Sequence, residues 1–217
     1  AQRWLTEEAQ KQQNIEDITR KALPNIADNA RPENMEKDWI TNFFDKGRLV
    51  SDQEMQDLWS RILAGEANRP GSCSRRTVNL LSSMDKRDAE LFKTFCAFVW
   101  DLGGLMPLIL DVQASIYNDV GINFNSLQHL ELVGLIKFDN LAGYQRLGLP
   151  QEPIIGYYSK PYRLKLPLAE KNSLPIGKAL LTTPGMELAL VAGSSPNLTY
   201  RDYVFEQWKA YNPAPAE

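Results

Sequence analysis

The chain has 217 residues, with a hydrophobic fraction of 43% and a formal net charge of −3, so it can form one domain or two small ones around a proper core. This acidic balance disfavours nucleic-acid binding, because whole-protein nucleic-acid binders usually carry a basic excess. No apolar run approaches the roughly 18 residues of a membrane span. Cys73 and Cys96 form no C-x-x-C pair, so we expect a reducing, cytoplasmic compartment.

The first segment, residues 2–23, predicts a helix that Pro24 ends. Its apolar residues form one narrow stripe and are too few for the helix to be buried on all sides. Trp4 and Leu5 would be exposed in a lone chain, so we predict an association surface there and a homo-oligomer, with a two-fold dimer as the default. A solvent-facing helix is the alternative. Since residue 1 is Ala and the segment resembles the middle of a helix, we also expect the native chain to continue upstream.

Four further helices follow in the N-terminal half. Pro32 fits the first turn of a helix that runs to Lys46, with Gly47 as a left-handed cap. Residues 51–54 predict a capping box that opens a helix ending near Gly65. Ser74 and Asp85 are expected to cap the next two helices. The second of these, residues 85–101, has apolar residues on all sides and is predicted to be central and buried.

Strand signals appear after residue 104 and alternate with short helices. Residues 106–110 fit either a strand or the start of a helix, whereas 135–138, 154–158 and 162–166 predict strands. Residues 126–134, 183–191 and 199–211 predict helices, and Trp208 is expected in the core. The fold class is therefore mainly α (α+β): a helical region, 1–84, packed on an α+β region, 85–217, either as two domains or as one continuous domain.

The order of elements in the second region is similar to a winged helix. A helix, a second element at 111–119, the helix 126–134, a strand and a two-stranded excursion follow one another. In that fold the third helix enters the major groove of DNA. Here it carries no Arg or Lys, the residues that supply most base and phosphate contacts. We therefore favour a protein-interaction role for this part, with DNA binding as the alternative.

Seven segments resemble a bacterial family known as domain of unknown function 2806. Together they span nearly the whole chain: residues 14–18, 38–46, 57–66, 74–79, 88–92, 129–136 and 177–182. Members of that family carry a further charged, Ala- and Glu-rich helical segment upstream, in keeping with the expected continuation here. The resemblance implies no activity and no catalytic residues.

No catalytic, cofactor or metal-binding motif is recognisable. Gly177-Lys178-Ala179 lacks the upstream Gly and the Ser or Thr of a phosphate loop. His129 is the only histidine and is best explained as a helix-surface or packing residue. The carboxylates of residues 36–66 fit caps and solvated faces better than a metal site. We predict no cofactor and no conventional enzyme, although an enzyme that uses only carboxylates would leave no such motif.

One basic concentration offers a candidate anion or nucleic-acid contact. It comprises Arg69, Arg75, Arg76, Lys86 and Arg87, on a loop and two helix starts. The alternative, which we favour, is that these residues form salt bridges to the preceding acidic helices. The sequence as a whole predicts a non-enzymatic protein-interaction or self-assembly module, and a winged-helix-like DNA-binding protein is the alternative.

Overall fold

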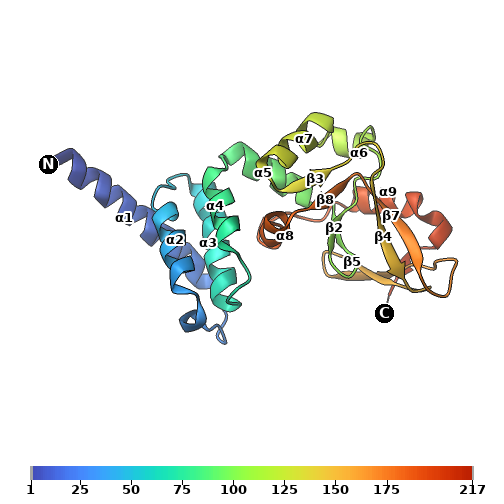
Figure 1. Cartoon of the computed structure of the whole chain (residues 1–217), viewed down its shortest axis with the longest axis horizontal. Coiled ribbons are helices and arrows are strands. Elements are labelled where there is room, and N and C mark those ends of the chain that lie inside the picture. Colours follow the sequence, from blue (N-terminus) through green and yellow to red (C-terminus); the bar gives the residue numbers. More distant parts are fainter. Residues whose placement is uncertain (1, 217) are drawn as a thin grey trace. The chain divides into compact units, whose positions relative to one another are not determined.

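The computed structural model describes residues 2–216 and divides into two compact units (Figure 1). The first comprises the chain up to Ala89 together with Thr183–Gly193, and the second comprises Glu90–Thr182 and the chain from Ser194 onward. Helices take up about 50% of the chain and strands 16%, which confirms the predicted mixed α+β class. Within the described residues, no helix is long and apolar enough to cross a membrane.

The first unit is built from helices around an aromatic core. Its elements are α1 (Gln2–Ala22), α2 (Lys37–Gly47), α3 (Gln53–Asn68), α4 (Arg75–Ser83) and α8 (Thr183–Ala189), with 3-10 turns η1 (Leu23–Asn25) and η2 (Pro32–Asn34). α1 packs on α3 and α2, α2 on α4, and α4 on α8. The ring of Phe43 lies 5.0 Å from those of Trp39 and Trp59, so aromatic contacts join α2 to α3.

Four predictions about helix ends in this unit are wrong. α3 ends at Asn68 and not near Gly65. Pro32 opens the separate turn η2, because Met35 is extended and α2 begins only at Lys37. Gly47 is not a left-handed cap: it is the last residue of α2, where a Cβ would come within 3.4 Å of Ile18 and Trp59. The cap of α3 is Asp52, one residue later than predicted, and its Oδ1 accepts hydrogen bonds from two amides at 3.0 Å.

The predicted caps of the next two helices are confirmed, but the second helix is shorter than predicted. Ser74 Oγ accepts from the Thr77 amide at 3.3 Å, and Asp85 Oδ1 accepts from the Asp88 amide at 3.0 Å. The expected central helix of residues 85–101 is wrong, since α5 (Lys86–Cys96) buries a single face and ends before Phe98. The next apolar residues enter strand β1 instead.

The second unit contains one larger sheet and two strand pairs, all antiparallel. β2 (Leu105–Pro107), β1 (Val99–Asp101), β5 (Ile154–Tyr157), β6 (Lys160–Arg163) and β9 (Ala214–Pro215) form the sheet in that order. β3 (Ile136–Phe138) pairs with β8 (Ala179–Leu181), and β4 (Tyr144–Leu149) with β7 (Asn172–Gly177). The ambiguous segment 106–110 therefore starts as a strand. The helices are α6 (Ser115–Asn118), α7 (Phe124–Val133), α9 (Leu198–Gln207) and the 3-10 turn η3 (Lys209–Tyr211).

Aromatic residues fill the core of this unit. The Trp100 ring stacks on Tyr157 at 4.6 Å, and its indole N–H donates to the Tyr200 hydroxyl at 3.2 Å. The Tyr200 hydroxyl lies 3.1 Å from the carbonyl oxygens of both Phe98 and Leu108, which share its one proton. Trp208 is buried against the same cluster, as the sequence predicted. The polar atoms of Trp100 and Tyr200 therefore have partners, as burial requires.

Only part of the element order behind the winged-helix prediction is present in the chain. α6 and α7 precede β3, which pairs with β8 through the register Ile136↔Leu181. Four strands, β4 to β7, lie between β3 and β8 in the chain, where the prediction had a two-stranded excursion. Asn123 and Ser126 form a capping box that begins α7. Gly134, in the left-handed conformation with φ 95°, ends it as predicted. α7 is thus a short helix with a cap at each end.

Candidate functional site

The N-terminal half of α1 has no tertiary contacts that bury it. The buried residues of α1 are Asn14, Ile18 and Ala22, all in its second half. Trp4 is 62% exposed and Leu5 is 60% exposed. Figure 1 shows this part of α1, in dark blue, continuing past α2 and α3. We call residues 2–13 the free half of α1.

The face of α1 that packs on the bundle continues into the free half. Trp4 and Ala22 are 18 residues apart, about five turns, so they lie on the same side of the helix. Lys11 lies on this side between them, whereas Leu5 lies about 100° round the helix from Trp4. The exposed Trp4 is therefore the continuation of a packing face, beyond the point where the rest of the unit covers it.

Local ion pairs and hydrogen bonds support the free half as a helix. Arg3 pairs with Glu7 at 2.8 Å, and Lys11 with Glu8 at 2.6 Å. The hydrogen bond from Lys11 lowers the pKa of Glu8. Opposite charges three or four residues apart modestly stabilise an isolated helix. They help the free half to stay helical in the absence of tertiary contacts.

Polar contacts fix the second half of α1 to its own unit. Asn14, which is buried, donates from Nδ2 to the carbonyl of Arg48 at 2.8 Å and accepts from Gln10 at 3.0 Å. Lys21 pairs with Asp57 of α3 at 2.7 Å. These contacts anchor α1 at its base and therefore set the direction of the free half.

The predicted basic residues do not form one patch. Lys86 Nζ lies 2.9 Å from Glu54 at the start of α3, while Arg69 follows the last residue of the same helix, about 24 Å away. Arg75 lies 3.9 Å from Asp38 of α2. Arg69, Arg76 and Arg87 are exposed and have no ion pair with any described residue. Two of the five residues therefore pair with the preceding acidic helices, as the alternative interpretation expected.

Two carboxylates that the sequence did not single out as structural residues hold the loop before α4. Glu66, 2% exposed, accepts hydrogen bonds from the amides of Gly71 at 2.6 Å and Cys73 at 2.9 Å. Glu187 of α8 accepts from the Ser74 amide at 2.8 Å and from Thr77 Oγ1 at 2.5 Å. The N-terminal end of α4, where two of the candidate basic residues lie, therefore already holds a carboxylate of the same unit.

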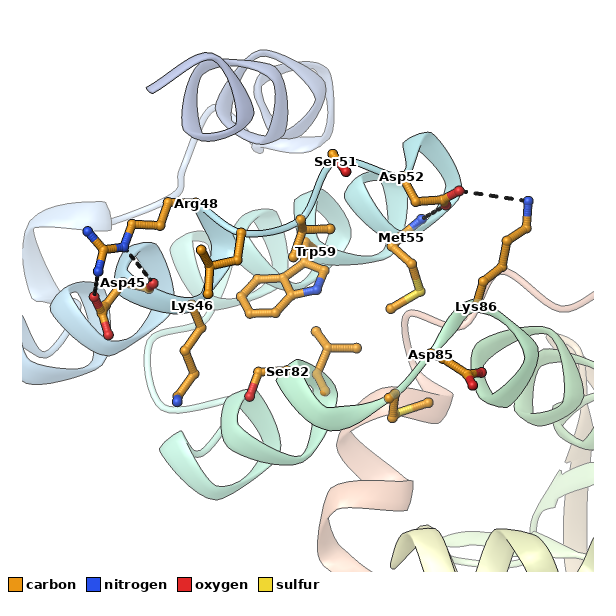
Figure 2. Close-up of a pocket in the computed structure, with 14 residues that line it drawn as sticks. Asp45, Lys46, Arg48, Ser51, Asp52, Met55, Trp59, Ser82, Asp85 and Lys86 are labelled. Carbon is orange, nitrogen blue, oxygen red and sulfur yellow. Dashed lines mark hydrogen bonds and ion pairs between the residues drawn. The ribbon is translucent and has the colours of Figure 1, made fainter. Parts of the chain in front are cut away.

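A pocket of about 470 Å³, which we call the Trp59 pocket, lies beside α3 and α4 (Figure 2). Its lining combines an apolar wall with a charged rim. The wall is formed by Leu49, Val50, Met55, Trp59, Leu81 and Met84, and the rim by Asp45, Lys46, Arg48, Asp52, Asp85 and Lys86, with Ser51 and Ser82. Its volume is within the range of small-molecule sites.

The carboxylates at the rim of the Trp59 pocket all have partners. Asp45 pairs with Arg48 at 2.9 Å, and Asp85 caps α5. Asp52 caps α3, and the hydrogen bond from the Met55 amide, together with the charge of Lys86, lowers its pKa. By contrast, the buried Trp59 Nε1 has no hydrogen-bond partner among residues 2–216. Lys46, near the end of α2, forms no ion pair with any described residue.

The groups most often used in catalysis do not come together. His129 is exposed on α7, and both cysteines are buried. Burial raises the pKa of Cys73 to about 12 and also raises that of Cys96, which keeps both as thiols near neutral pH. In the described part of the chain, no group of three or more His, Cys, Asp or Glu residues is placed to hold a metal ion.

Comparison with known proteins gives one match. The family model described as "Protein of unknown function (DUF2806)" matches residues 1–205, which confirms the resemblance seen in the sequence. No curated protein and no solved structure matches the chain.

Proposed function

The chain belongs to the DUF2806 family, and we propose that it is a non-enzymatic interaction module that self-associates through the free half of α1. The observation that carries this proposal is the 62% exposure of Trp4 on a face that is buried further along the same helix. Tryptophan is among the residues enriched at interfaces and at their energetic centres. A helical face that extends beyond its own bundle is open to a second helix.

Charge complementarity favours a second copy of the chain as the partner. Trp4, Glu8, Lys11 and Ile15 form one stripe at helical spacing, in the order apolar, acidic, basic, apolar. In an antiparallel two-fold pair centred between Glu8 and Lys11, each Glu8 faces Lys11 of the second copy, and each Trp4 faces Ile15. The stripe is therefore complementary to itself, as an isologous interface requires.

Size-exclusion chromatography with light scattering tests this proposal. We expect a mass above that of the 24.6 kDa chain, concentration-dependent in the micromolar range. Trp4→Ala should weaken the association by about 2 kcal/mol, or roughly 30-fold. Leu23→Ala is the matched control, because Leu23 is 60% exposed but lies outside the free half, and it should leave the association unchanged. A monomer at high micromolar concentration, or equal effects of the two variants, would contradict the proposal.

A winged-helix-like DNA binder is the second candidate. It is favoured by α6 and α7 leading into β3, by the pairing of β3 with β8, and by the outward-facing polar side chains of α7, Asn125, Gln128 and His129. Asn and Gln side chains can form paired hydrogen bonds with adenine in the major groove. The absence of Arg and Lys from α7 ranks this candidate second.

Anisotropy titrations with a labelled duplex distinguish the two candidates. A DNA binder would lose affinity steeply between about 50 and 200 mM salt. It would also lose affinity on Arg75→Ala/Arg76→Ala substitution but not on Arg163→Ala, an exposed arginine of β6. For the favoured interaction module we expect weak binding at low salt, insensitive to both changes.

A further inference from the structure

We propose that the Trp59 pocket binds a small apolar molecule that carries an anionic group and a further hydrogen-bond acceptor. This site is independent of the free half of α1. The inference starts from the groups around the pocket that have no partner. Polar atoms buried in a protein nearly always have a hydrogen-bond partner, so an unsatisfied one lining a pocket indicates where a ligand can supply it.

The unused hydrogen-bonding capacity at the pocket consists mainly of donors. Trp59 is 0% exposed, and its indole N–H, which can only donate, has no partner in the described chain. A ligand therefore reaches this N–H only when the side chains that cover it move aside. The Lys46 side chain is half-buried at the rim, and its ammonium has no carboxylate within ion-pair distance among the described residues. The Ser51 hydroxyl at the rim can donate or accept. A ligand that matches these groups must therefore supply acceptors.

The engaged carboxylates explain why the ligand would be an anion. Asp45 is paired with Arg48, while Asp52 and Asp85 accept hydrogen bonds from helix N-terminal amides. Because none of these carboxylates lies within ion-pair distance of Lys46, its charge is available to a ligand. A cationic ligand would have to displace one of the existing contacts, whereas an anion displaces none.

The position of the two donors constrains the shape of the ligand. Figure 2 shows the Trp59 nitrogen turned toward the Met55 side of the pocket, while Lys46 runs past Ser82 on the other side of the indole ring. One small ion cannot reach both donors. A molecule with an apolar body between its acceptor and its charge can, and the apolar wall provides the surface for that body.

The test is an NMR titration of the ¹⁵N-labelled full chain with N-acetyl-L-phenylalanine, which carries a carboxylate, an amide acceptor and an apolar ring. We expect a saturable downfield shift of the Trp59 indole N–H, with a dissociation constant of about 1 mM or tighter. The neutral probe N-acetyl-L-phenylalanine amide should bind at least about fivefold more weakly, because it lacks the charge that Lys46 attracts.

Matched variants separate the roles of the two donors. Trp59→Phe keeps a ring but removes the N–H and should weaken binding about tenfold, as followed by the methyl signal of Met55. Lys46→Gln should weaken it about fivefold without affecting the fold, since Lys46 lies at the rim. The controls are Trp39→Phe, which removes an equally buried and unpaired indole N–H outside this pocket, and Lys37→Gln. Both should change affinity by less than about twofold.

Three results would overturn the proposal. The first is an indole signal of Trp59 that does not move up to about 10 mM probe. The second is equal binding of the charged and neutral probes. The third is an equal loss of affinity in Trp59→Phe and Trp39→Phe, which would show that the substitutions act through the stability of the unit and not through the pocket.

Discussion

Replacing Glu66 with Ala should destabilise the first unit more than any other single loss of a carboxylate there. Glu66 is 2% exposed and connects the end of α3 to the loop before α4 through the amides of Gly71 and Cys73 and the hydroxyl of Ser72. Without the carboxylate these donors lose their acceptor. Gly71 is exposed, so water can reach its amide, but Cys73 is buried.

The expected cost follows from this difference. An unsatisfied buried donor, here the Cys73 amide, costs about 1–3 kcal/mol, and the loss of a hydrogen bond whose donor water can reach, here the Gly71 amide, costs about 1 kcal/mol. We therefore expect Glu66→Ala to lower the free energy of unfolding by about 2–4 kcal/mol. Glu66→Gln keeps one oxygen but places an amide group where the second oxygen accepted, so it should cost about half as much.

Urea denaturation followed by circular dichroism measures the change in unfolding free energy. Amide hydrogen exchange at Cys73 reports the local effect directly, and its protection should fall in Glu66→Ala. Glu33→Ala is the control, because Glu33 is exposed and forms no hydrogen bond with a described residue, and it should change stability by less than about 0.5 kcal/mol. If Glu66→Ala cost no more than Glu33→Ala, or left Cys73 protected, the structural role of Glu66 would be refuted.

Two further predictions follow from the pKa shifts. The hydrogen bond from the Met55 amide lowers the folded-state pKa of Asp52 below its ordinary value of 3.8, so its contribution to stability is present above that value and is lost as pH falls through the lower folded pKa. Asp52→Asn, which keeps a cap, should therefore show a smaller fall in the urea midpoint between about pH 6 and pH 2.5 than the wild type, and equal falls would contradict this. Burial raises the pKa of Cys73 to about 12 and that of Cys96 as well, so a thiol reagent at about pH 8 should label neither in the native protein and both in denaturant. Fast native labelling of either cysteine would show that its burial is wrong.

The sequence predicted local features well. Ser74, Asp85 and Gly134 act at helix ends through contacts within a few residues, and each was found where its residue type predicted. The helix of residues 85–101 was predicted wrongly because Val99 and Trp100 fit a helical apolar pattern as well as they fit the start of a strand. Only the pairing of β1 with β2 and β5, a tertiary feature, decides between the two.

Tertiary contacts also explain what the sequence could not predict about the sites. Gly47 has the residue type of a helix cap, but what requires it is the close approach of Ile18 and Trp59, from two other elements. Thr77 and Glu187 are 110 residues apart in the chain. The Trp59 pocket likewise combines residues from α2, α3, α4 and the start of α5, none of which forms a recognisable motif. The exposure of Trp4 and Leu5, by contrast, was predicted from the narrow stripe of α1 alone.

Sedimentation velocity on a charge-swap series tests self-association through α1 most directly. In the antiparallel pair, Glu8→Lys places a second ammonium group beside Lys11 of the other copy, and Lys11→Glu places two carboxylates together, twice in each dimer by symmetry. Each exchange turns an attraction into a repulsion at both contacts, so either single variant should weaken the dimer about tenfold. The double variant Glu8→Lys/Lys11→Glu should restore the wild-type dimer fraction. A wild type that sediments as a 24.6 kDa monomer, or a double variant as dissociated as the single ones, would contradict the account.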